Sequence, residues 1–145
     1  LDEATVGLAN EMIGGAQTLL DTAVDYAKMR MQFGRQIGSF QAIKHKCADL
    51  LLEIELARSG VLKATDAIDN NDPTTPSLAS LAKSAASDAY MHAASECIQI
   101  HGGIGFTWDN DTHLWFKRAK SNEVFLGTPL SHRERYIALS RTSHE

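Results

Sequence analysis

The chain has little cysteine and no excess of positive charge, and both shortages exclude classes of protein. Its only cysteines, Cys47 and Cys97, are too few for a metal site and fall within apolar helical patterns. We therefore expect two buried free thiols in a reducing compartment. The net charge is −4 with acids and bases interleaved, whereas a nucleic-acid or anionic-membrane surface needs clustered Lys and Arg. We expect neither nucleic acid nor membrane as a partner.

Long apolar runs and targeting signals are missing too. No run is long enough to span a bilayer, and Leu1-Asp2-Glu3 lacks the basic start of a signal peptide. The content of 43% apolar and 22% charged residues is ordinary for a soluble globular protein, and 145 residues suffice for one domain. Because the chain lacks an initiator Met and begins on a helical pattern, we expect a fragment of a longer protein.

No segment alternates clearly with period two, and apolar residues recur instead at helical spacing. The predicted helices cover residues 4–32, Gln41–Asn70, Ser77–Ile100, Thr112–Glu123 and Pro129–Ser140, with Ser77 as a candidate N-cap. The sequence therefore predicts an all-α fold over residues 1–145. It is an antiparallel up-and-down helical bundle with three long helices plus one or two shorter ones.

Small residues mark two of these helices. Gly14 and Gly15 interrupt the first pattern, and each weakens a helix by roughly 1 kcal/mol relative to Ala. Close packing of another backbone against them would explain why they are tolerated. The third helix is rich in alanine, which allows helices to approach closely.

One group of candidate binding residues follows the first helix, in the segment Arg30–Gln41 (RMQFGRQIGSFQ). Arg30 offers a fixed charge and a planar fork suited to phosphate, and Phe33 could stack on a flat ring. An Arg near a helix C-terminus also interacts favourably with the helix dipole. From the residues alone, this structural explanation stays open.

A second group lies in the segment Gln99–Phe106 (QIHGGIGF), whose spacing matches neither a dinucleotide fingerprint nor a Walker loop. The paired glycines Gly102 and Gly103 would let backbone amides approach a diphosphate or a flavin edge, and Gln99 would add an amide contact. A helix C-cap explains the same glycines, so both interpretations stand.

Together with Val124–Thr128 (VFLGT), these segments resemble the C-terminal helical domain of the acyl-CoA dehydrogenases. The first matches the pattern R-x-x-F-G-x-x-I-x-x-F-Q at every fixed position, and the second matches Q-x-x-G-G-x-G-[FY]. The resemblance covers essentially the whole chain. It implies that the N-terminal helical domain and the middle β-domain of the complete subunit are absent here.

The resemblance implies an FAD-dependent oxidoreductase of lipid metabolism that oxidises an acyl-CoA thioester to its α,β-enoyl form. It further implies a homo- or hetero-oligomer (dimer or tetramer), an electron-transfer acceptor protein, and the bacterial cytoplasm as location, with the mitochondrial matrix as the alternative. By this resemblance, the adenosine-diphosphate part of FAD would contact Arg30, Gln32, Phe33 and Gln41. FAD would also be reached, from a neighbouring subunit, by Gln99, Gly102 and Gly103. Thr128 would contact the cofactor, and Gly127 would lie near the thioester end of the substrate.

Both positions that usually hold the catalytic glutamate of this family are apolar in the present chain. One is Leu126, just before the Gly-Thr pair, and the other is Ala4, about seven helical turns before Arg30. Neither side chain can take the α-proton of a thioester. We therefore hypothesise a non-catalytic subunit without catalytic residues of its own.

Two further segments depart from the common family pattern, namely Lys117–Lys120 (KRAK) and Leu126–Glu134 (LGTPLSHRE). They resemble subunits of bacterial heteromeric acyl-CoA dehydrogenases, including steroid-type enzymes. In such an assembly, one partner supplies the base while the other is catalytically silent.

Other functions stay open at this stage. A flavin-free helical assembly module would keep the bundle, and a plain helical binding protein would leave both glycine segments coincidental. His132 with Glu134 suggests a proton relay, although a surface or interface pair is the better supported interpretation. No E-x-x-H pair supports a di-metal bundle, so no metal site is expected.

Overall fold

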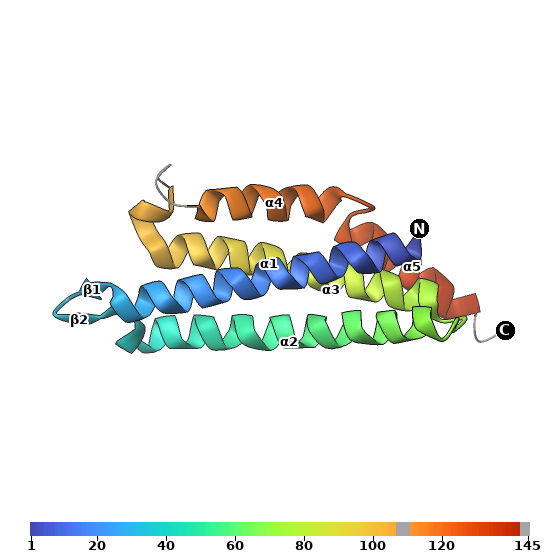
Figure 1. The fold of residues 1–145 in the computed structure, drawn as a ribbon, viewed down its shortest axis with the longest axis horizontal. Coiled ribbons are helices and arrows are strands. Elements are labelled where there is room, and N and C mark those ends of the chain that lie inside the picture. Colours follow the sequence, from blue (N-terminus) through green and yellow to red (C-terminus); the bar gives the residue numbers. More distant parts are fainter. Residues whose placement is uncertain (107–110, 143–145) are drawn as a thin grey trace.

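The computed structural model describes residues 1–106 and 111–142 (Figure 1). Its helices are α1 (Asp2–Met29), α2 (Gln41–Asp69), α3 (Thr75–His101), α4 (Thr112–Val124) and α5 (Pro129–Thr142). They are joined by β1 (Met31–Gln32), β2 (Arg35–Gln36) and the short 3-10 helices η1 (Ile37–Ser39) and η2 (Gly102–Phe106). The predicted all-α bundle of three long and two shorter helices is confirmed.

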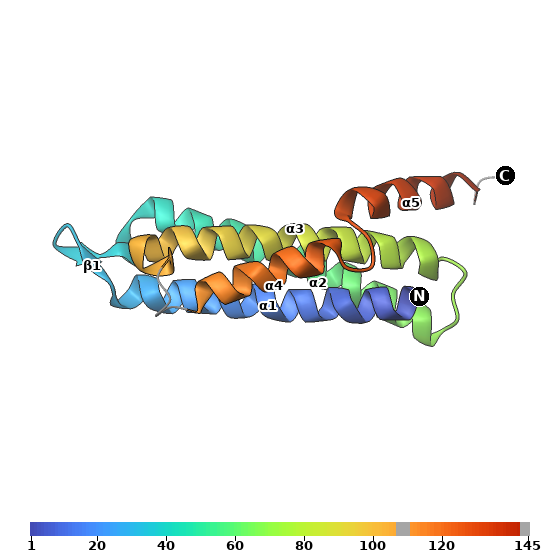
Figure 2. The ribbon, with the colours of Figure 1, turned by 90° about the horizontal axis from the view of Figure 1, so that it is seen from above.

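Helix α3 lies at the centre of the bundle and packs against all four other helices. Successive long helices run antiparallel, so α1 and α3 point the same way and α2 points back between them (Figures 1 and 2). Helix α4 lies along α1 and α3, and α5 covers one end of α3. The buried alanines of α3 are Ala79, Ala82, Ala86, Ala89, Ala93 and Ala94. The expected close approach of helices along an alanine-rich face is therefore confirmed.

The first helix ends at Met29, earlier than predicted, because the chain turns into a hairpin. Its strands β1 and β2 pair Met31 with Gln36 and Gln32 with Arg35. The turn residues Phe33 and Gly34 have φ of 54° and 77°, as a primed hairpin turn requires. Strands of two residues are too short to produce an alternating pattern, so periodicity could not reveal them.

Helix α3 begins before the predicted N-cap. Thr74 occupies the cap position and Pro76 lies in the first turn. The Asp72 carboxylate accepts hydrogen bonds from Thr74 N–H at 2.7 Å and from Thr74 Oγ1 at 2.6 Å, which orders the preceding turn. Ser77 Oγ donates to the Thr74 carbonyl instead of accepting from a helix N–H. The prediction of Ser77 as N-cap is therefore wrong.

Both cysteines are free thiols, as predicted, but only one is fully buried. Cys97 lies in the core, where burial raises the pKa of its thiol to about 11. Cys47 is half-buried, and burial raises its pKa as well. Both thiols are therefore protonated and weakly nucleophilic at neutral pH.

Gly15 makes room for an aromatic ring and not for another backbone. A Cβ atom added to Gly15 would lie 2.6 Å from Cζ of Tyr90, a side chain that is only 1% exposed. A Cβ atom on Gly14 would meet nothing within 4 Å. The expected packing partner is therefore corrected to the ring of Tyr90 on α3.

Replacing Gly15 by Ala is expected to lower the free energy of unfolding by about 1–3 kcal/mol, because the new methyl group and the buried ring must move apart. The neighbouring Gly14→Ala is the matched control. It is expected to raise the free energy of unfolding by about 0.5–1 kcal/mol, since its space is open and Ala favours a helix. Denaturant unfolding followed by circular dichroism measures both, and equal effects would contradict the role given to Tyr90.

Candidate functional site

The predicted site residues gather at opposite ends of the bundle (Figure 1). We call one the hairpin end, formed by the β1–β2 hairpin and the start of η2, and the other the turn end, formed by the start of α1 and the α4–α5 turn. The hairpin end holds Arg30, Gln32, Phe33, Gln41, Gln99, Gly102 and Gly103, and the turn end holds Ala4, Leu126, Gly127 and Thr128.

At the hairpin end, two segments that are far apart in the sequence line one cavity of about 420 Å³. Arg30 and Gln32 come from the first segment, and Gly102 and Gly103 from the second. The other lining residues are Tyr26, Ile37, Ile100, His101 and Ile104. Residues predicted from two separate motifs are thus neighbours in space.

A stacked pair of rings helps to line this cavity. The rings of Tyr26 and His101 have centroids 4.2 Å apart and planes 24° apart. His101 Nδ1 lies 2.7 Å from the Cys97 carbonyl, to which it donates, so the ring orientation is fixed from behind. Sequence reasoning missed Tyr26, although it lies one helical turn before Arg30 and so on the same side of the chain.

Phe33 lies at the tip of the hairpin and is 91% exposed. A bulky residue at positive φ is uncommon, which marks the position as unusual. Its ring meets the edge of Phe40 at a centroid distance of 6.2 Å, and the Arg35 guanidinium lies 3.8 Å above the Phe40 ring. Phe33 does not line the cavity, nor do the exposed side chains of Gln41 and Gln99.

At the turn end, the chain reverses from α4 into α5 through residues 125–128, here called the base-position turn. Leu126 and Gly127 have φ of 58° and 108°, both in the region that favours glycine. A Cβ atom on Gly127 would lie 2.9 Å from His132 Nε2, so only glycine fits there. Leu126 is half-buried and packs against the core, whereas Thr128 is exposed.

Lys83 is fully buried beneath this turn, and sequence reasoning missed it. Its ammonium lies 3.0 Å from the Asn122 carbonyl, 3.3 Å from the Glu123 carbonyl and 3.2 Å from the Gly127 carbonyl. It also lies 3.0 Å from Ser87 Oγ. The signal was present, because Lys83 has helical spacing to the alanines that form the buried face of α3.

His132 is also buried, so the predicted surface pair with Glu134 is wrong. Its Nε2 lies 2.9 Å from the Leu126 carbonyl and donates to it, and its Nδ1 lies 3.3 Å from Ser80 Oγ. Glu134 is exposed, since residues two apart on a helix point in different directions. His132 therefore fixes the base-position turn from α5.

Burial lowers the pKa of His132. The hydrogen bond to the Leu126 carbonyl and the negative charge of Asp2 oppose this shift, whereas the positive charges of Lys83 and Arg135 add to it. The unfolded chain therefore binds the proton more tightly than the folded one. The contribution of neutral His132 to the free energy of unfolding is therefore fully present above about pH 6.5, and it is lost as the pH falls towards and through the lowered pKa of the folded state.

We expect the free energy of unfolding to fall more steeply between about pH 7 and about pH 5 in the natural chain than in His132→Gln. Denaturant unfolding at a series of pH values measures the two slopes. Parallel slopes would show that His132 does not titrate in a buried site.

The acidic residues near the two apolar base positions are largely engaged elsewhere. Ala4 is exposed on the first turn of α1. Arg135 Nη1 lies 2.7 Å from Asp2 Oδ1, and this hydrogen bond lowers the pKa of Asp2. The half-buried Glu123 pairs with Lys120. Neither carboxylate is thus poised as a base in this structure.

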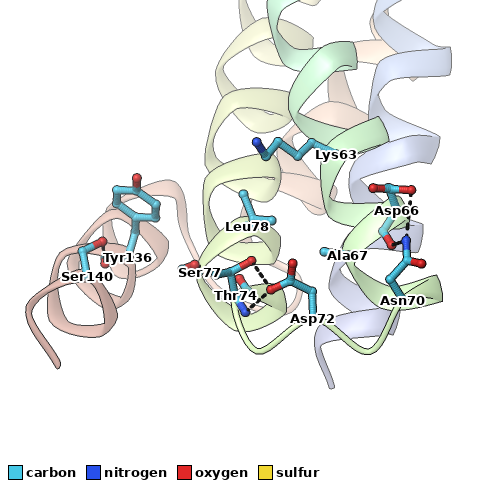
Figure 3. A pocket seen from close by; sticks show the side chains of 10 residues that line it. All are labelled: Lys63, Asp66, Ala67, Asn70, Asp72, Thr74, Ser77, Leu78, Tyr136 and Ser140. Carbon is cyan, nitrogen blue, oxygen red and sulfur yellow. Dashed lines mark hydrogen bonds between the residues drawn. The ribbon is translucent and has the colours of Figure 1, made fainter. Parts of the chain in front are cut away.

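A wider cavity of about 630 Å³ lies between the α2–α3 turn and α5 (Figure 3). Its lining consists of Lys63, Asp66, Ala67, Asn70, Asp72, Thr74, Ser77, Leu78, Tyr136 and Ser140. Polar side chains there bond to one another, as Asp72 does with Thr74 and Asn70 with Asp66. None of the predicted site residues lines this cavity.

Residues 1–106 and 111–142 hold no cluster of three His, Cys, Asp or Glu side chains suited to a metal ion. None of their helices has the length and hydropathy of a membrane-spanning segment.

Comparison with known proteins identifies the family. Residues 1–138 match the family model described as "Acyl-CoA dehydrogenase, C-terminal domain". The chain is 49% identical over 128 residues to acyl-CoA dehydrogenase IpdE2 of Mycobacterium tuberculosis, a match that covers 88% of this chain and 38% of that protein.

Two solved structures resemble the fold closely. Butyryl-CoA dehydrogenase from Megasphaera elsdenii has a TM-score of 0.91 at 33% identity, over 95% of this chain and 36% of the other. A variant of the Tcur3481–Tcur3483 steroid ACAD has a TM-score of 0.93 at 32% identity, over 99% of this chain and 40% of the other.

The chain spans less than half of the length of each of these relatives. The family match nevertheless covers nearly all of the chain and includes all three segments that carried the resemblance. The chain therefore belongs to the acyl-CoA dehydrogenase family.

Proposed function

We propose that residues 1–145 are the C-terminal bundle of an FAD-dependent acyl-CoA dehydrogenase that oxidises a CoA thioester to its α,β-enoyl form. The observation that carries the proposal is the cavity at the hairpin end, where Arg30 and Gln32 meet Gly102 and Gly103. A guanidinium, an amide and accessible backbone suit the diphosphate of a dinucleotide. The names of the relatives support the same reaction.

The hairpin end fits FAD by its chemistry. A Cβ atom on Gly102 or Gly103 would meet nothing within 4 Å, so a ligand can approach the backbone there. The exposed Phe33 ring offers a flat apolar surface for stacking. The further amide contacts that we propose are Gln32, Gln41 and Gln99. When bound, FAD would supply the acceptor for the hydride that leaves the β-carbon of the thioester.

The two ends of the bundle favour an oligomer with shared flavin sites. Lys83, whose ammonium contacts the Gly127 carbonyl, lies about 27 Å along α3 from His101, at 1.5 Å per residue. We propose that the hairpin end contacts the flavin of a neighbouring subunit. Thr128 would contact a second flavin, and Gly127 would lie at the thioester end of the substrate. Such a division needs at least a dimer.

We further propose that this subunit supplies no catalytic base. Removal of the α-proton needs a carboxylate, and Leu126 and Ala4 occupy the two usual positions. A partner subunit of a hetero-oligomer would then carry the base. The structurally similar Tcur3481–Tcur3483 steroid ACAD carries the names of two proteins, which is consistent with such an assembly.

The remaining partners follow from the reaction. An acyl-CoA is the substrate, and an electron-transfer protein would reoxidise the flavin. We place the protein in lipid metabolism and in the bacterial cytoplasm, on the strength of the match to a bacterial relative.

A flavin-free assembly module is the second candidate. It is favoured by several exposed leucines on α2 and α3, which would suit a subunit interface. Its members are Leu51, Leu52, Leu56, Leu62 and Leu81. This candidate gives no role to the cavity at the hairpin end or to the exposed Phe33 ring.

The complete assembly, purified with all its subunits, tests these proposals. In the absence of oxygen, a panel of CoA thioesters is added and the visible flavin band is followed. Bleaching together with formation of the enoyl product is the expected result. An assembly without flavin would favour the assembly module, and flavin that no thioester bleaches would contradict the dehydrogenase assignment.

A further inference from the structure

The end of helix α4 is held by a buried charge. The carbonyls in the last turn of a helix have no partner within the helix and form the negative end of its dipole. The Lys83 ammonium reaches two of them, on Asn122 and Glu123, and also reaches the Gly127 carbonyl. With Ser87 Oγ, four uncharged oxygens surround three N–H donors. Lys83 therefore ties the end of α4 to the base-position turn.

A second side chain holds the adjacent peptide group. His132 Nε2 donates to the Leu126 carbonyl at 2.9 Å, from α5, while Lys83 approaches the Gly127 carbonyl from α3. Two successive carbonyls are thus fixed from different helices. These carbonyls belong to the peptide groups on either side of Gly127, and Lys83 also holds the Asn122 and Glu123 carbonyls, so the backbone is held both before and after residue 126.

The turn needs such support because its backbone is strained. Leu126 has φ of 58°, a conformation that a residue with a side chain rarely adopts. Strained positions persist only where the surroundings hold them, and they cluster at functional sites. A buried ammonium is itself costly unless all its protons are bonded. Because burying the Lys83 ammonium costs free energy and the turn above it is strained, we infer that the shape of this turn matters for more than folding.

We propose that Lys83 is a positioning residue that, with His132, holds residue 126 and Gly127 at the thioester end of the substrate. This inference rests on the proposed function, which assigns the base-position turn to that place. Lys83 touches neither substrate nor cofactor in this account and acts through the carbonyls that it binds.

Hydrogen exchange of the intact parent subunit tests the anchor without any activity measurement. Lys83→Met should speed exchange of the amides in residues 122–130 by about tenfold or more, with little change in residues 99–104 at the distant hairpin end. Lys120→Met is the matched control, since this exposed lysine lies on α4 close to the same turn but pairs with Glu123. Unchanged exchange in Lys83→Met, or an equal change in the control, would overturn the proposal.

A kinetic measurement separates positioning from a merely structural role. In a parent subunit that carries Leu126→Glu, Lys83→Met should slow anaerobic flavin bleaching by about 10- to 100-fold, because small displacements of a reacting group are costly. The half-saturating thioester concentration should change less than about threefold, since the binding surfaces elsewhere are intact. A bleaching rate within twofold of the Leu126→Glu parent would overturn the positioning role.

Lys83→Gln keeps two amide donors, and it decides the same questions if Lys83→Met does not fold. It should change exchange and bleaching in the same directions by smaller factors. Failure of the proposed function gives a different result, in which Leu126→Glu binds flavin but no thioester bleaches it. That result would remove the assigned role of the turn, while exchange still decides whether Lys83 anchors it.

Discussion

If residue 126 is the missing base position, as we propose, a parent subunit that carries Leu126→Glu is expected to gain the reductive half-reaction. The new carboxylate stands where the family usually places its base, on a turn whose carbonyls are held by Lys83 and His132. A positioned general base contributes about 10²–10⁴-fold, so the rate of anaerobic flavin bleaching by a CoA thioester should rise by at least about 100-fold. Stopped-flow absorbance of the flavin band measures this rate.

Leu126→Gln is the matched control for that experiment. Its side chain has nearly the shape of Glu but cannot accept the α-proton, so its bleaching rate should stay at that of the natural subunit. If Gln accelerated bleaching as much as Glu, the effect would come from polarity or altered packing. The proposal that the natural subunit lacks a base at residue 126 would then be contradicted.

Arg30→Ala is expected to weaken FAD binding to the parent assembly by about 10- to 100-fold. The guanidinium at the cavity of the hairpin end would lose charge-assisted hydrogen bonds to the diphosphate, each worth about 1.5–3 kcal/mol. Titration of the flavin-free assembly with FAD, followed by flavin fluorescence, gives the dissociation constant.

Lys28→Ala is the control for the loss of a cation in the same part of the chain. Lys28 is exposed in the last turn of α1 and does not line the cavity, so FAD affinity should change less than about threefold. The structural explanation of Arg30, a favourable contact with the helix dipole, predicts a different result. In that case, Arg30→Ala would lower the stability of the helix by about 0.3–1 kcal/mol and leave FAD affinity unchanged.

The helices could be predicted from the sequence because their apolar spacing persists over many turns. The starts of α2, α4 and α5 lie at the predicted residues Gln41, Thr112 and Pro129. The exceptions have local causes. The turn formed by Phe33 and Gly34 ends the first helix early, and Asp72 orders the start of α3 ahead of Ser77.

The site could be predicted only in part. The two motifs of the hairpin end could be found in the sequence, but their meeting in one cavity depends on how α1 and α3 pack. Lys83 was missed because lysine is almost never fully buried unless its ammonium is bonded, and those bonds come from α4 and the following turn. His132 was misjudged for the same reason, since its partner is a backbone carbonyl of the preceding turn.

The parent subunit purified without any other subunit tests most directly whether this chain builds part of a flavin site but supplies no base. It is mixed with CoA thioesters in the absence of oxygen, and the flavin band is recorded. We expect a bound flavin whose band is not bleached until a partner subunit is added. Bleaching by the subunit alone would contradict this expectation and would direct mutagenesis to Glu3 and Glu123 as alternative bases.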